Sequence, residues 1–361
     1  MATHQQTAAL KIAVMGAGLI GRRHVEGIML EPQAMAAAII DPSSSARDFA
    51  SAKNIAWFPS FKQAGDKIAL DGVIIATPNQ LHLENALEAI HAGLPTLVEK
   101  PIAHNADAAE ILVREAEKTG VPILVGHHRR HNPVIRAAKR VLDDGRLGKI
   151  LMAHGNFWVA KPDDYFDTQW RREAGGGPIL INLIHDVDLF RFFFGEVESV
   201  HAMQANLARA HAVEDTVVVV LRFDSGVLAT LSGSDAVASP WSWEMTAGEN
   251  LVFPRQDQLC YQIGGTAGSL SIPQLTLWTN ASKPNWLERL AEEQVHFTPA
   301  DPLAVQLKHF CDVICRKADP LVTGREGLAT LRVIEAIKLS AETGQTVHVN
   351  NRPPARSGHD D

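Results

Sequence analysis

The sequence is poor in cysteine, with 3 in 361 residues, so it lacks the framework of a small disulfide-bonded secreted protein. Cys260, Cys311 and Cys315 are predicted to be free thiols of a protein in a reducing cytoplasm. The last two stand four positions apart in "HFCDVICRK", and this spacing predicts that both lie on the buried face of one helix.

Basic charge and long apolar runs are also scarce. The formal net charge is −7, which argues against nucleic acid as a partner, because a protein that binds the phosphate backbone needs a basic surface. No uncharged apolar run reaches the roughly 18 residues of a membrane-spanning helix, so no membrane partner is expected. The first residues, "MATHQQTAAL", lack a basic region followed by an apolar stretch, so we expect no signal peptide and a cytoplasmic location.

The length predicts two domains, because one hydrophobic core stops growing at about 250–300 residues. In residues 1–126, short apolar strands alternate with amphipathic helices, which is typical of a parallel sheet covered on both faces. We therefore predict an α/β domain here, a doubly wound Rossmann sheet. The expected strands are 10–15, 36–40, 72–77, 95–100 and 122–127, and the expected helices are 18–30, 81–93 and 105–120.

Residues 127–350 follow a different pattern, in which strands dominate. The segment 213–236 reads as two strands around the turn Asp224–Gly226, and 259–279 reads as a second pair around a glycine-rich turn. Helices are expected at about 302–318 and 325–343, and 345–349 closes the chain as a strand. The prediction is an α+β domain on a large, mainly antiparallel sheet, with a frayed tail at 351–361.

A glycine-rich motif, "GAGLIG" at 16–21, follows the first strand and opens the first helix. Gly16 allows the tight turn, Gly18 lets a pyrophosphate approach the backbone, and Gly21 lets the helix pack close to the sheet. The phosphates would bind the free N–H groups at the helix start, around Leu19 and Ile20.

An acidic residue, Asp41, ends the next expected strand, twenty positions after Gly21. Its carboxylate would accept hydrogen bonds from the adenosine ribose and repel a 2′-phosphate, which favours NAD over NADP. Three serines and Arg47 follow at once, and Arg47 could reach a phosphate, so NADP stays open.

Several further motifs occur in a specific order along almost the whole chain: "GAGLIGRRH", "TPNQLH", "VEKP", "VGHHRRHNP", "GGGPILINLIHDVD" and "GGTAGSL". With them the chain resembles the glucose–fructose oxidoreductase and inositol dehydrogenase (Gfo/Idh/MocA) family. The resemblance implies a nucleotide domain followed by a domain with an open, mainly antiparallel sheet. It also implies that this sheet pairs subunits, so we expect a homodimer or homotetramer formed through strands such as "TVVVVLRF".

The resemblance also assigns roles to residues of the first domain. Thr77, Asn79 and His82 match a loop beside the nicotinamide side of the cofactor. Glu99 and Lys100 match the pair after the fifth strand, where the family's lysine hydrogen-bonds both the cofactor and the reacting hydroxyl.

The stretch "GGGPILINLIHDVD" at 175–188 is an apolar run with polar residues at unexpected places. His185 matches the family's histidine that exchanges the substrate proton, and imidazole suits this role because it titrates near neutral pH. Asn182, three positions earlier, shares a helix face with it and could orient a substrate hydroxyl. Many members carry an aspartate where this chain has Ile181, so either His185 works with Lys100 alone or another acid, Asp186 or Asp188, supports it.

A long aromatic and charged segment precedes this stretch and suits a polar ring substrate, through Trp158, Tyr165, Trp170 and Arg171. The segment "GHHRRH" at 126–131 is interpreted as a hinge, with His128 or Arg129 near the substrate. His127 and His131 have a metal-like spacing, but no third ligand accompanies them, so no metal is expected.

We therefore predict an NAD(P)-dependent dehydrogenase that transfers hydride between nicotinamide and a secondary alcohol or ketone of a sugar, inositol or related cyclic polyol. Three alternatives stay open. The substrate could be an aromatic cis-dihydrodiol, because Ile181 makes the pocket more apolar. The reaction could be NAD-dependent glycoside hydrolysis, or the chain could be a non-catalytic sugar sensor, although its Lys100 and His185 argue against a sensor.

Overall fold

The computed structural model describes residues 9–173, 175–280 and 283–349, which form two compact units. The first unit combines residues up to Asn132 with the later segment Ala300–Leu331, and the second combines Pro133–Pro299 with the chain from Arg332 onward. The predicted domain bounds placed all of 127–350 in the second domain, whereas 127–132 and Ala300–Leu331 belong to the first unit. The reason is the packing of this segment's helix α9 (Pro302–Ile314), which contacts α1 (Leu19–Leu30) and the 3-10 turn at His128–His131.

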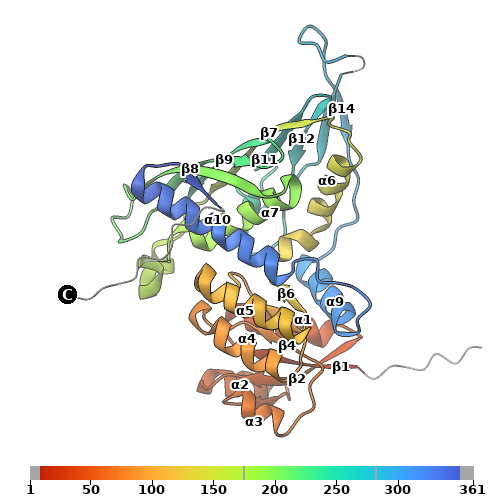
Figure 1. Cartoon of the computed structure of the whole chain (residues 1–361), viewed down its shortest axis with the longest axis vertical. Helices are drawn as coiled ribbons and strands as arrows, with labels where there is room; N and C mark the ends of the chain where they lie inside the picture. Colours follow the sequence, from red (N-terminus) through yellow and green to blue (C-terminus); the bar gives the residue numbers. More distant parts are fainter. Residues whose placement is uncertain (1–8, 174, 281–282, 350–361) are drawn as a thin grey trace, which may run out of the picture. The chain divides into compact units, whose positions relative to one another are not determined.

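The first unit is built on a six-stranded parallel sheet with the strand order β3-β2-β1-β4-β5-β6 (Figure 1). Its strands are β1 (Leu10–Met15), β2 (Ala34–Ile40), β3 (Ala56–Phe58), β4 (Gly72–Ile75), β5 (Thr96–Val98) and β6 (Ile123–Val125). Its other helices are α2 (Ser44–Ala52), α3 (Phe61–Gly65), α4 (His82–His91) and α5 (Ala106–Thr119), with 3-10 turns η1 (Asn79–Leu81) and η2 (His128–His131).

The strand order explains where the helices go. The chain runs outward from β1 to β3 in one direction, and then outward from β4 to β6 in the other. Right-handed crossovers in opposite directions place α1 and α2 on one face of the sheet and α4 and α5 on the other. The order therefore reverses between β1 and β4, which is the position where doubly wound sheets bind their ligands.

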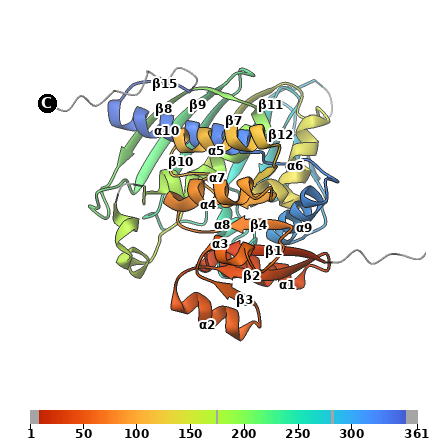
Figure 2. The ribbon, with the colours of Figure 1, turned by 60° about the horizontal axis from the view of Figure 1, so that its bottom comes forward.

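The second unit is built on a nine-stranded mixed sheet with the order β14-β13-β12-β11-β7-β10-β9-β8-β15 (Figure 2). Every neighbouring pair of its strands is antiparallel except β7 and β10. The strands are β7 (Ile150–Trp158), β8 (Val197–Ala205), β9 (Thr216–Phe223), β10 (Leu228–Ser234), β11 (Tyr261–Gly265), β12 (Gly268–Ile272), β13 (Thr276–Thr279), β14 (Ala291–Gln294) and β15 (Val347–His348). The helices are α6 (Pro133–Asp143), α7 (Ile184–Phe194), α8 (Trp243–Thr246) and the end of α10 (Gly324–Thr343), with 3-10 turns η3 (Asp163–Asp167) and η4 (Gln169–Arg172) and a π-helical turn η5 (Ile179–Leu183).

One face of this sheet forms the core of the second unit. Along β9, Val217, Val219 and Leu221 are buried and pack with residues of α6, α7 and α10, whereas Val218 and Val220 are exposed. This alternation is what a strand with one covered face requires. The other face of the sheet consequently presents apolar side chains.

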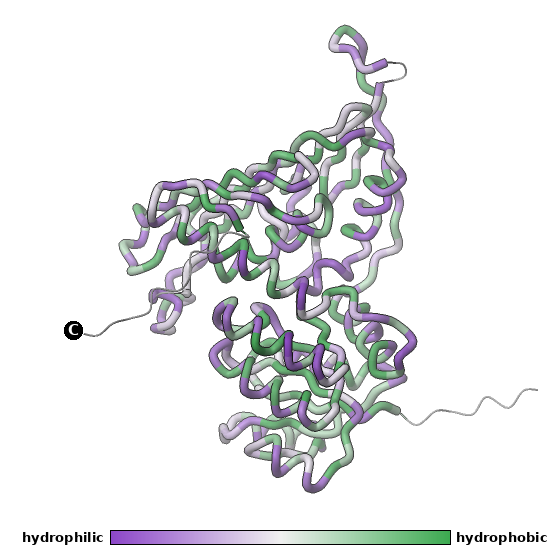
Figure 3. The backbone as a smooth tube through the Cα atoms, in the orientation of Figure 1, coloured by the Kyte–Doolittle hydropathy of each residue, from purple (hydrophilic) through white to green (hydrophobic). Residues whose placement is uncertain are grey.

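The expected fold class is confirmed in both units: a parallel Rossmann sheet, then a mainly antiparallel one. In Figure 3 the helices of the first unit alternate hydrophilic and hydrophobic residues, as amphipathic helices do. The strand β3 was not predicted from the sequence, because it has only three residues, of which Ala56 is exposed and Trp57 and Phe58 are half-buried.

The cysteines of the two units are free, and Cys260 and Cys311 are buried. The prediction that Cys315 lies on a buried helix face is wrong, because α9 ends at Ile314 and leaves Cys315 exposed. Within the ranges described, no helix is long and apolar enough to cross a bilayer. In those same ranges, no three His, Cys, Asp or Glu side chains gather as a metal site.

Candidate active site

The register of the parallel sheet places the predicted cofactor residues at one edge. Met15 pairs with both Ile40 and Ile75, Ile75 pairs with Val98, and Val98 pairs with Val125. The residue that follows each strand therefore leaves the sheet at the same edge. These residues introduce five predicted site segments: Gly16, Asp41, Ala76–Thr77, Glu99–Lys100 and Gly126–Arg129.

The glycine-rich turn is shaped by close backbone approaches. Gly16 has φ +90°, and a Cβ there would lie 2.5 Å from the carbonyl oxygen of Ala76. A Cβ on Gly21 would lie 2.0 Å from the carbonyl oxygen of Gly16, so α1 can pack this closely only with glycine. Around Gly18, by contrast, no heavy atom lies within 4 Å of that position, and Leu19 is 93% exposed. The start of α1 thus leaves open the space that a pyrophosphate needs, and its N–H groups fit that anion.

Asp41 is tied to this turn. Its carboxylate accepts hydrogen bonds from the main-chain N–H of Ala17 (2.9 Å) and from that of Ser43 (2.8 Å). Burial alone would raise the pKa of Asp41, but these hydrogen bonds and the nearby Arg22 charge outweigh it and hold the pKa below its usual value. Each carboxylate oxygen can accept a further bond, so an ionised Asp41 remains able to accept from ribose hydroxyls.

Two arginines flank this acidic residue, and the sequence analysis had noticed only one of them. Arg22 donates to the carbonyl oxygens of Ala17 (2.9 Å) and Ser45 (3.3 Å), so its guanidinium is held by the turn itself. Arg47 is exposed and stacks over the ring of Trp57, with 5.6 Å from Cζ to the ring centroid. Arg22 is the first arginine of the motif "GRRH" at 21–24, and nothing in its spacing marked it as a cation held by the turn.

The loop after β4 is braced by His82. This histidine is only 1% exposed, and its two ring nitrogens lie 2.8 Å from the carbonyl oxygens of Thr77 and Pro101. Burial lowers the pKa of His82, and the two carbonyls offset this only in part. These two contacts join the loop that holds Thr77 and Asn79 to the one that follows Lys100, so His82 braces both predicted cofactor loops.

Glu99 forms a buried hydrogen-bonded pair with His24 of α1 (2.7 Å), which the sequence did not predict. Burial alone would raise the pKa of Glu99, but the His24 hydrogen bond and charge, together with the charges of His128 and Lys100, keep it low. Gly126 leaves room for this carboxylate, because a Cβ there would lie 2.9 Å from Glu99 Oε2. Lys100 itself is half-buried, beside this pair.

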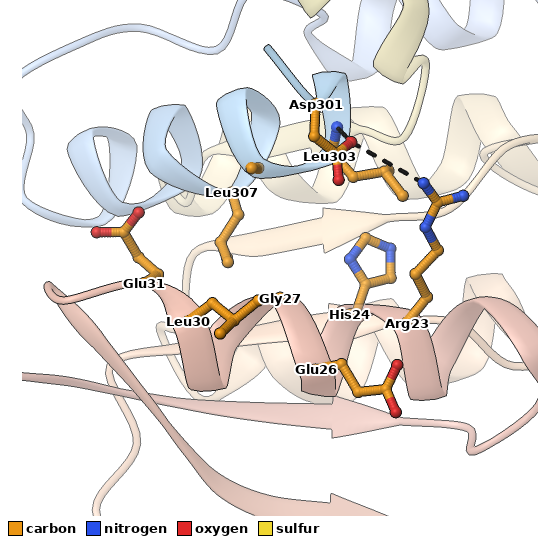
Figure 4. Close-up of a pocket in the computed structure, with 10 residues that line it drawn as sticks. Arg23, His24, Glu26, Gly27, Leu30, Glu31, Asp301, Leu303 and Leu307 are labelled. Atoms are coloured by element: carbon orange, nitrogen blue, oxygen red, sulfur yellow. Dashed lines mark hydrogen bonds and ion pairs between the residues drawn. The ribbon is translucent and has the colours of Figure 1, made fainter. Parts of the chain in front are cut away.

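His24 also lines a groove between α1 and α9, where Arg23 and Asp301 form an ion pair at 3.9 Å (Figure 4). In η2, His128 is half-buried and Arg129 is buried. The helix α9 therefore contacts two elements near the sheet edge that carries Glu99: α1, whose His24 bonds Glu99, and η2.

The glycine run of the second unit approaches a carboxylate. A Cβ on Gly177 would lie 2.2 Å from Glu214 Oε1, and the same oxygen accepts from the main-chain N–H of Ile179 at 3.0 Å. Burial raises the pKa of Glu214, although this hydrogen bond and the Lys338 charge oppose it. Glu214 thus holds the first turn of the helix that carries Asn182 and His185.

The predicted helix begins as a π-helical turn, η5, and continues as α7. Such turns recur at functional sites, because they re-aim the side chains that they carry. Asn182 lies in this turn, half-buried, and accepts a hydrogen bond from Lys161 Nζ at 2.8 Å. His185 follows in α7 and is 8% exposed.

The two acids proposed to support His185 are both buried, at about 1% exposure. Asp186 accepts a hydrogen bond from the Tyr261 hydroxyl, which engages this carboxylate with β11. Ile181 is half-buried in η5.

Three of the four predicted ring-binding residues lie together. Arg171 stacks on the ring of Tyr165, with 4.0 Å from Cζ to the centroid, and lies 5.6 Å from the ring of Trp170, which is 50% exposed. Trp158 lies on β7, on the sheet face opposite the buried Phe157, and donates from Nε1 to Ser232 Oγ (3.0 Å).

A Rossmann sheet edge with an open glycine turn and an ionised acidic residue at the next strand is typical of a dinucleotide-binding protein. Residues 10–127 match the model described as "Oxidoreductase family, NAD-binding Rossmann fold", and residues 135–271 match "GFO/IDH/MocA C-terminal domain". The chain belongs to the Gfo/Idh/MocA family, whose members bind NAD(H).

The relatives carry varied names. The chain is 29% identical over 283 residues to "1,5-anhydro-D-fructose reductase" of Ensifer adhaerens, covering 78% of this chain and 80% of that protein. It is 25% identical to "scyllo-inositol 2-dehydrogenase (NAD(+))" of Bacillus subtilis (strain 168), covering 94% and 96%. Among solved structures, it is similar to the WlbA dehydrogenase of Bordetella pertussis in complex with NADH and UDP-GlcNAcA, with TM-score 0.76, 25% identity and coverage of 94% and 98%.

Proposed function

We propose that this NAD(P)-dependent oxidoreductase transfers hydride between nicotinamide and a secondary alcohol or ketone of a sugar, an inositol or a related cyclic polyol. The observation that carries the proposal is the common edge of the parallel sheet, where Lys100 follows β5 at the same edge as the glycine turn and Asp41. The relatives named for an anhydro-sugar and an inositol support the substrate class.

Bound NAD supplies the hydride acceptor in this proposal. Lys100 donates a hydrogen bond to the substrate oxygen, which stabilises negative charge on it as the proton leaves. His185 takes that proton, and Asn182 orients the substrate ring. The cluster of Tyr165, Trp170 and Arg171 offers aromatic faces and donors to a polar ring.

We propose NAD rather than NADP as the preferred cofactor. The support is the ionised Asp41, whose charge opposes a 2′-phosphate, and the stacking of Arg47 on Trp57, which gives this arginine another partner.

A cyclic aromatic cis-dihydrodiol is the second candidate substrate. The observation that favours it is the half-buried Ile181 in η5, one residue before Asn182, which adds apolar surface to this turn. Glycoside hydrolysis and ligand sensing have no comparable support in the side chains described above.

The test of the proposed function is a panel of sugars, inositols, other polyols and dihydrodiols. Each compound is assayed with NAD and with NADP, and turnover is measured by the absorbance of the NADH or NADPH formed. Turnover of a polyol with NAD supports the proposal, and turnover confined to a dihydrodiol supports the second candidate. A glycoside cleaved without net NADH, or binding of sugars without any turnover, contradicts both.

We also propose a homodimer or homotetramer that covers the open face of the nine-stranded sheet. Met203, Val218, Val220 and Leu228 are exposed on neighbouring strands of that face, between 46% and 71%. Apolar surface of this kind is normally covered. The free cysteines suit the cytoplasmic location that the sequence predicts.

A further inference from the structure

Beside Asn182 the second unit holds a buried cation, Lys161. Its side chain is only 9% exposed, and Nζ lies 2.8 Å from Asn182 Oδ1 and 3.5 Å from Asp235 Oδ2. Lysine is almost never buried without a partner, because removing an ammonium group from water is costly. The ammonium of Lys161 is therefore held for a structural or functional reason.

The surrounding residues keep Lys161 in place. The side chain of Asp235 is 3% exposed and also lies 3.3 Å from Arg209 Nε. Arg209 Nη2 donates to the main-chain oxygens of both Lys161 (2.7 Å) and Asp235 (2.9 Å). The ring of Tyr165 lies 4.8 Å from Lys161 Nζ. Backbone and side chain of Lys161 are thus both fixed, so its ammonium points steadily at Asn182.

This arrangement decides which way the Asn182 amide faces. An ammonium group has only hydrogens to donate, so it requires the amide oxygen of Asn182 and excludes the amide NH₂. The two amide hydrogens must then point along the other branch of the side chain. Asn182 is half-buried, and over the stretches of chain described above no acceptor bonds its Nδ2.

We propose that Lys161 is a positioning residue that determines substrate specificity, by fixing the Asn182 amide so that its NH₂ donates to a substrate oxygen. This inference rests on the proposed function. It selects an oxygen that accepts a hydrogen bond, such as a carbonyl, carboxylate or hydroxyl lone pair, next to the reacting carbon. A carboxylate at this turn would instead accept a hydrogen bond from a substrate hydroxyl. An enzyme with the fixed amide therefore selects substrates with an acceptor at this position, whereas one with a carboxylate selects a donor. Burial lowers the pKa of Lys161, although Asp235 opposes it, which agrees with a cation held out of water.

The test is a double-mutant cycle on the whole protein with the polyol that it oxidises best and saturating NAD. Asn182→Ala and Lys161→Met should each raise KM about 3- to 10-fold, the value of one net hydrogen bond, with kcat changed less. Because Lys161 acts through Asn182, the double variant should be no worse than Asn182→Ala alone. Lys149→Met, an exposed lysine of the same unit, is the matched control and should leave KM unchanged.

A further variant separates donation from acceptance. Asn182→Asp keeps an acceptor for Lys161 but removes the NH₂ donor, so its KM should rise at least as much as that of Asn182→Ala. A wild-type KM in Asn182→Asp overturns the inference, because the substrate would then be a donor to residue 182. Equal effects of Lys161→Met in the wild-type and Asn182→Ala backgrounds overturn it as well.

A second readout needs no substrate. The proteins of the cycle are the wild type, Asn182→Ala, Lys161→Met and the double variant. If Lys161 and Asn182 are bonded, the two substitutions should change the unfolding midpoint non-additively. If the wild type oxidises no compound of the panel, the proposed function fails, and additive midpoints would then show separately that Lys161 does not hold Asn182.

Discussion

The two units build their parts of the proposed site in different ways. In the first unit, the residues follow the ends of paired strands, so the sheet register brings them to one edge, and side-chain bonds such as His24–Glu99 only brace them there. In the second unit, side chains far apart in sequence hold the site. The bonds Lys161–Asn182, Glu214–Ile179 and Tyr261–Asp186 span 21, 35 and 75 positions.

This difference has consequences for substitutions. A site placed by backbone register changes little when one side chain is removed, because the strands keep their pairing. A site placed by side-chain bonds depends on each partner, and the loss of one can be offset by a change in the other. The first unit should therefore give local effects on cofactor binding, and the second should give coupled effects on catalysis and stability.

The largest expected effect comes from the second unit's proposed base. Removal of a general base typically costs about 10²–10⁴-fold in rate, so His185→Ala should lower kcat by that order. NAD affinity, measured by calorimetry, should stay unchanged, because the cofactor edge belongs to the first unit. Lys100→Met should lower kcat comparably and also weaken NAD binding, and this contrast sharpens the comparison between the units.

His296 is exposed, so His296→Ala serves as the matched control for His185→Ala and should keep full activity. An His185→Ala protein with wild-type kcat would mean that the base lies elsewhere. Loss of NAD affinity in that variant would mean that the two parts of the site are not separate.

The second prediction concerns Gly177, where any larger residue would clash with the carboxylate of Glu214. An alanine there would place Cβ 2.2 Å from Glu214 Oε1, so Gly177→Ala should destabilise the protein by about 1–3 kcal/mol, as overpacking does. In a Glu214→Ala background the clash is gone, and the same substitution should cost almost nothing. The measurement is the unfolding free energy of the four proteins of this cycle.

Gly264→Ala is the matched control, because its Cβ would make only ordinary contact with Met152 at 3.6 Å. If Gly177→Ala lowers the unfolding free energy equally with and without Glu214, the carboxylate is not the reason that position 177 requires glycine. The second unit's part of the site would then depend less on side-chain partners than we infer.

The sequence predicted which residues of the first unit follow the ends of its strands, for a physical reason. Gly16, Asp41 and Glu99 stand directly after apolar strands, with Lys100 next, and strand ends can be read from hydrophobic runs. What it could not predict are bonds that depend on tertiary packing. His24 gave no sign that it pairs with Glu99, and Lys161 none that it reaches Asn182, because no periodicity links these positions. Trp158 shows the same limit, since only the pleat of β7 decides which face it occupies.

The third prediction returns to the first unit. Asp41→Ser removes the negative charge near a 2′-phosphate, so the ratio of NAD to NADP affinity should fall about tenfold, a difference of roughly 1.4 kcal/mol. NAD binding should also weaken somewhat, because Asp41 no longer accepts from the Ala17 N–H. Calorimetry with both cofactors measures this, with the exposed Asp48→Ser as control. An unchanged ratio would show that Arg22 or Arg47, and not Asp41, sets the preference.

The smallest expected effect is a change in how stability depends on pH. Burial raises the pKa of Glu214 above its ordinary value of 4.5, so in the folded protein this carboxyl keeps its proton to higher pH than in the unfolded chain. Its contribution to stability is therefore fully present below pH 4.5 and is lost as pH rises through the folded pKa. Glu214→Gln cannot ionise, yet its amide oxygen can still accept from the Ile179 N–H. The variant should lose less stability than the wild type as the pH rises from 4.5, with a difference in Tm below about 4 °C.

Thermal unfolding from pH 4 upward measures how Tm changes with pH in both proteins. The variant Glu292→Gln, at an exposed position, shows the change expected for a carboxylate outside the network. Parallel curves for the wild type and Glu214→Gln would mean that the Lys338 charge cancels the effect of burial, and that the first turn of this helix is held by the hydrogen bond alone.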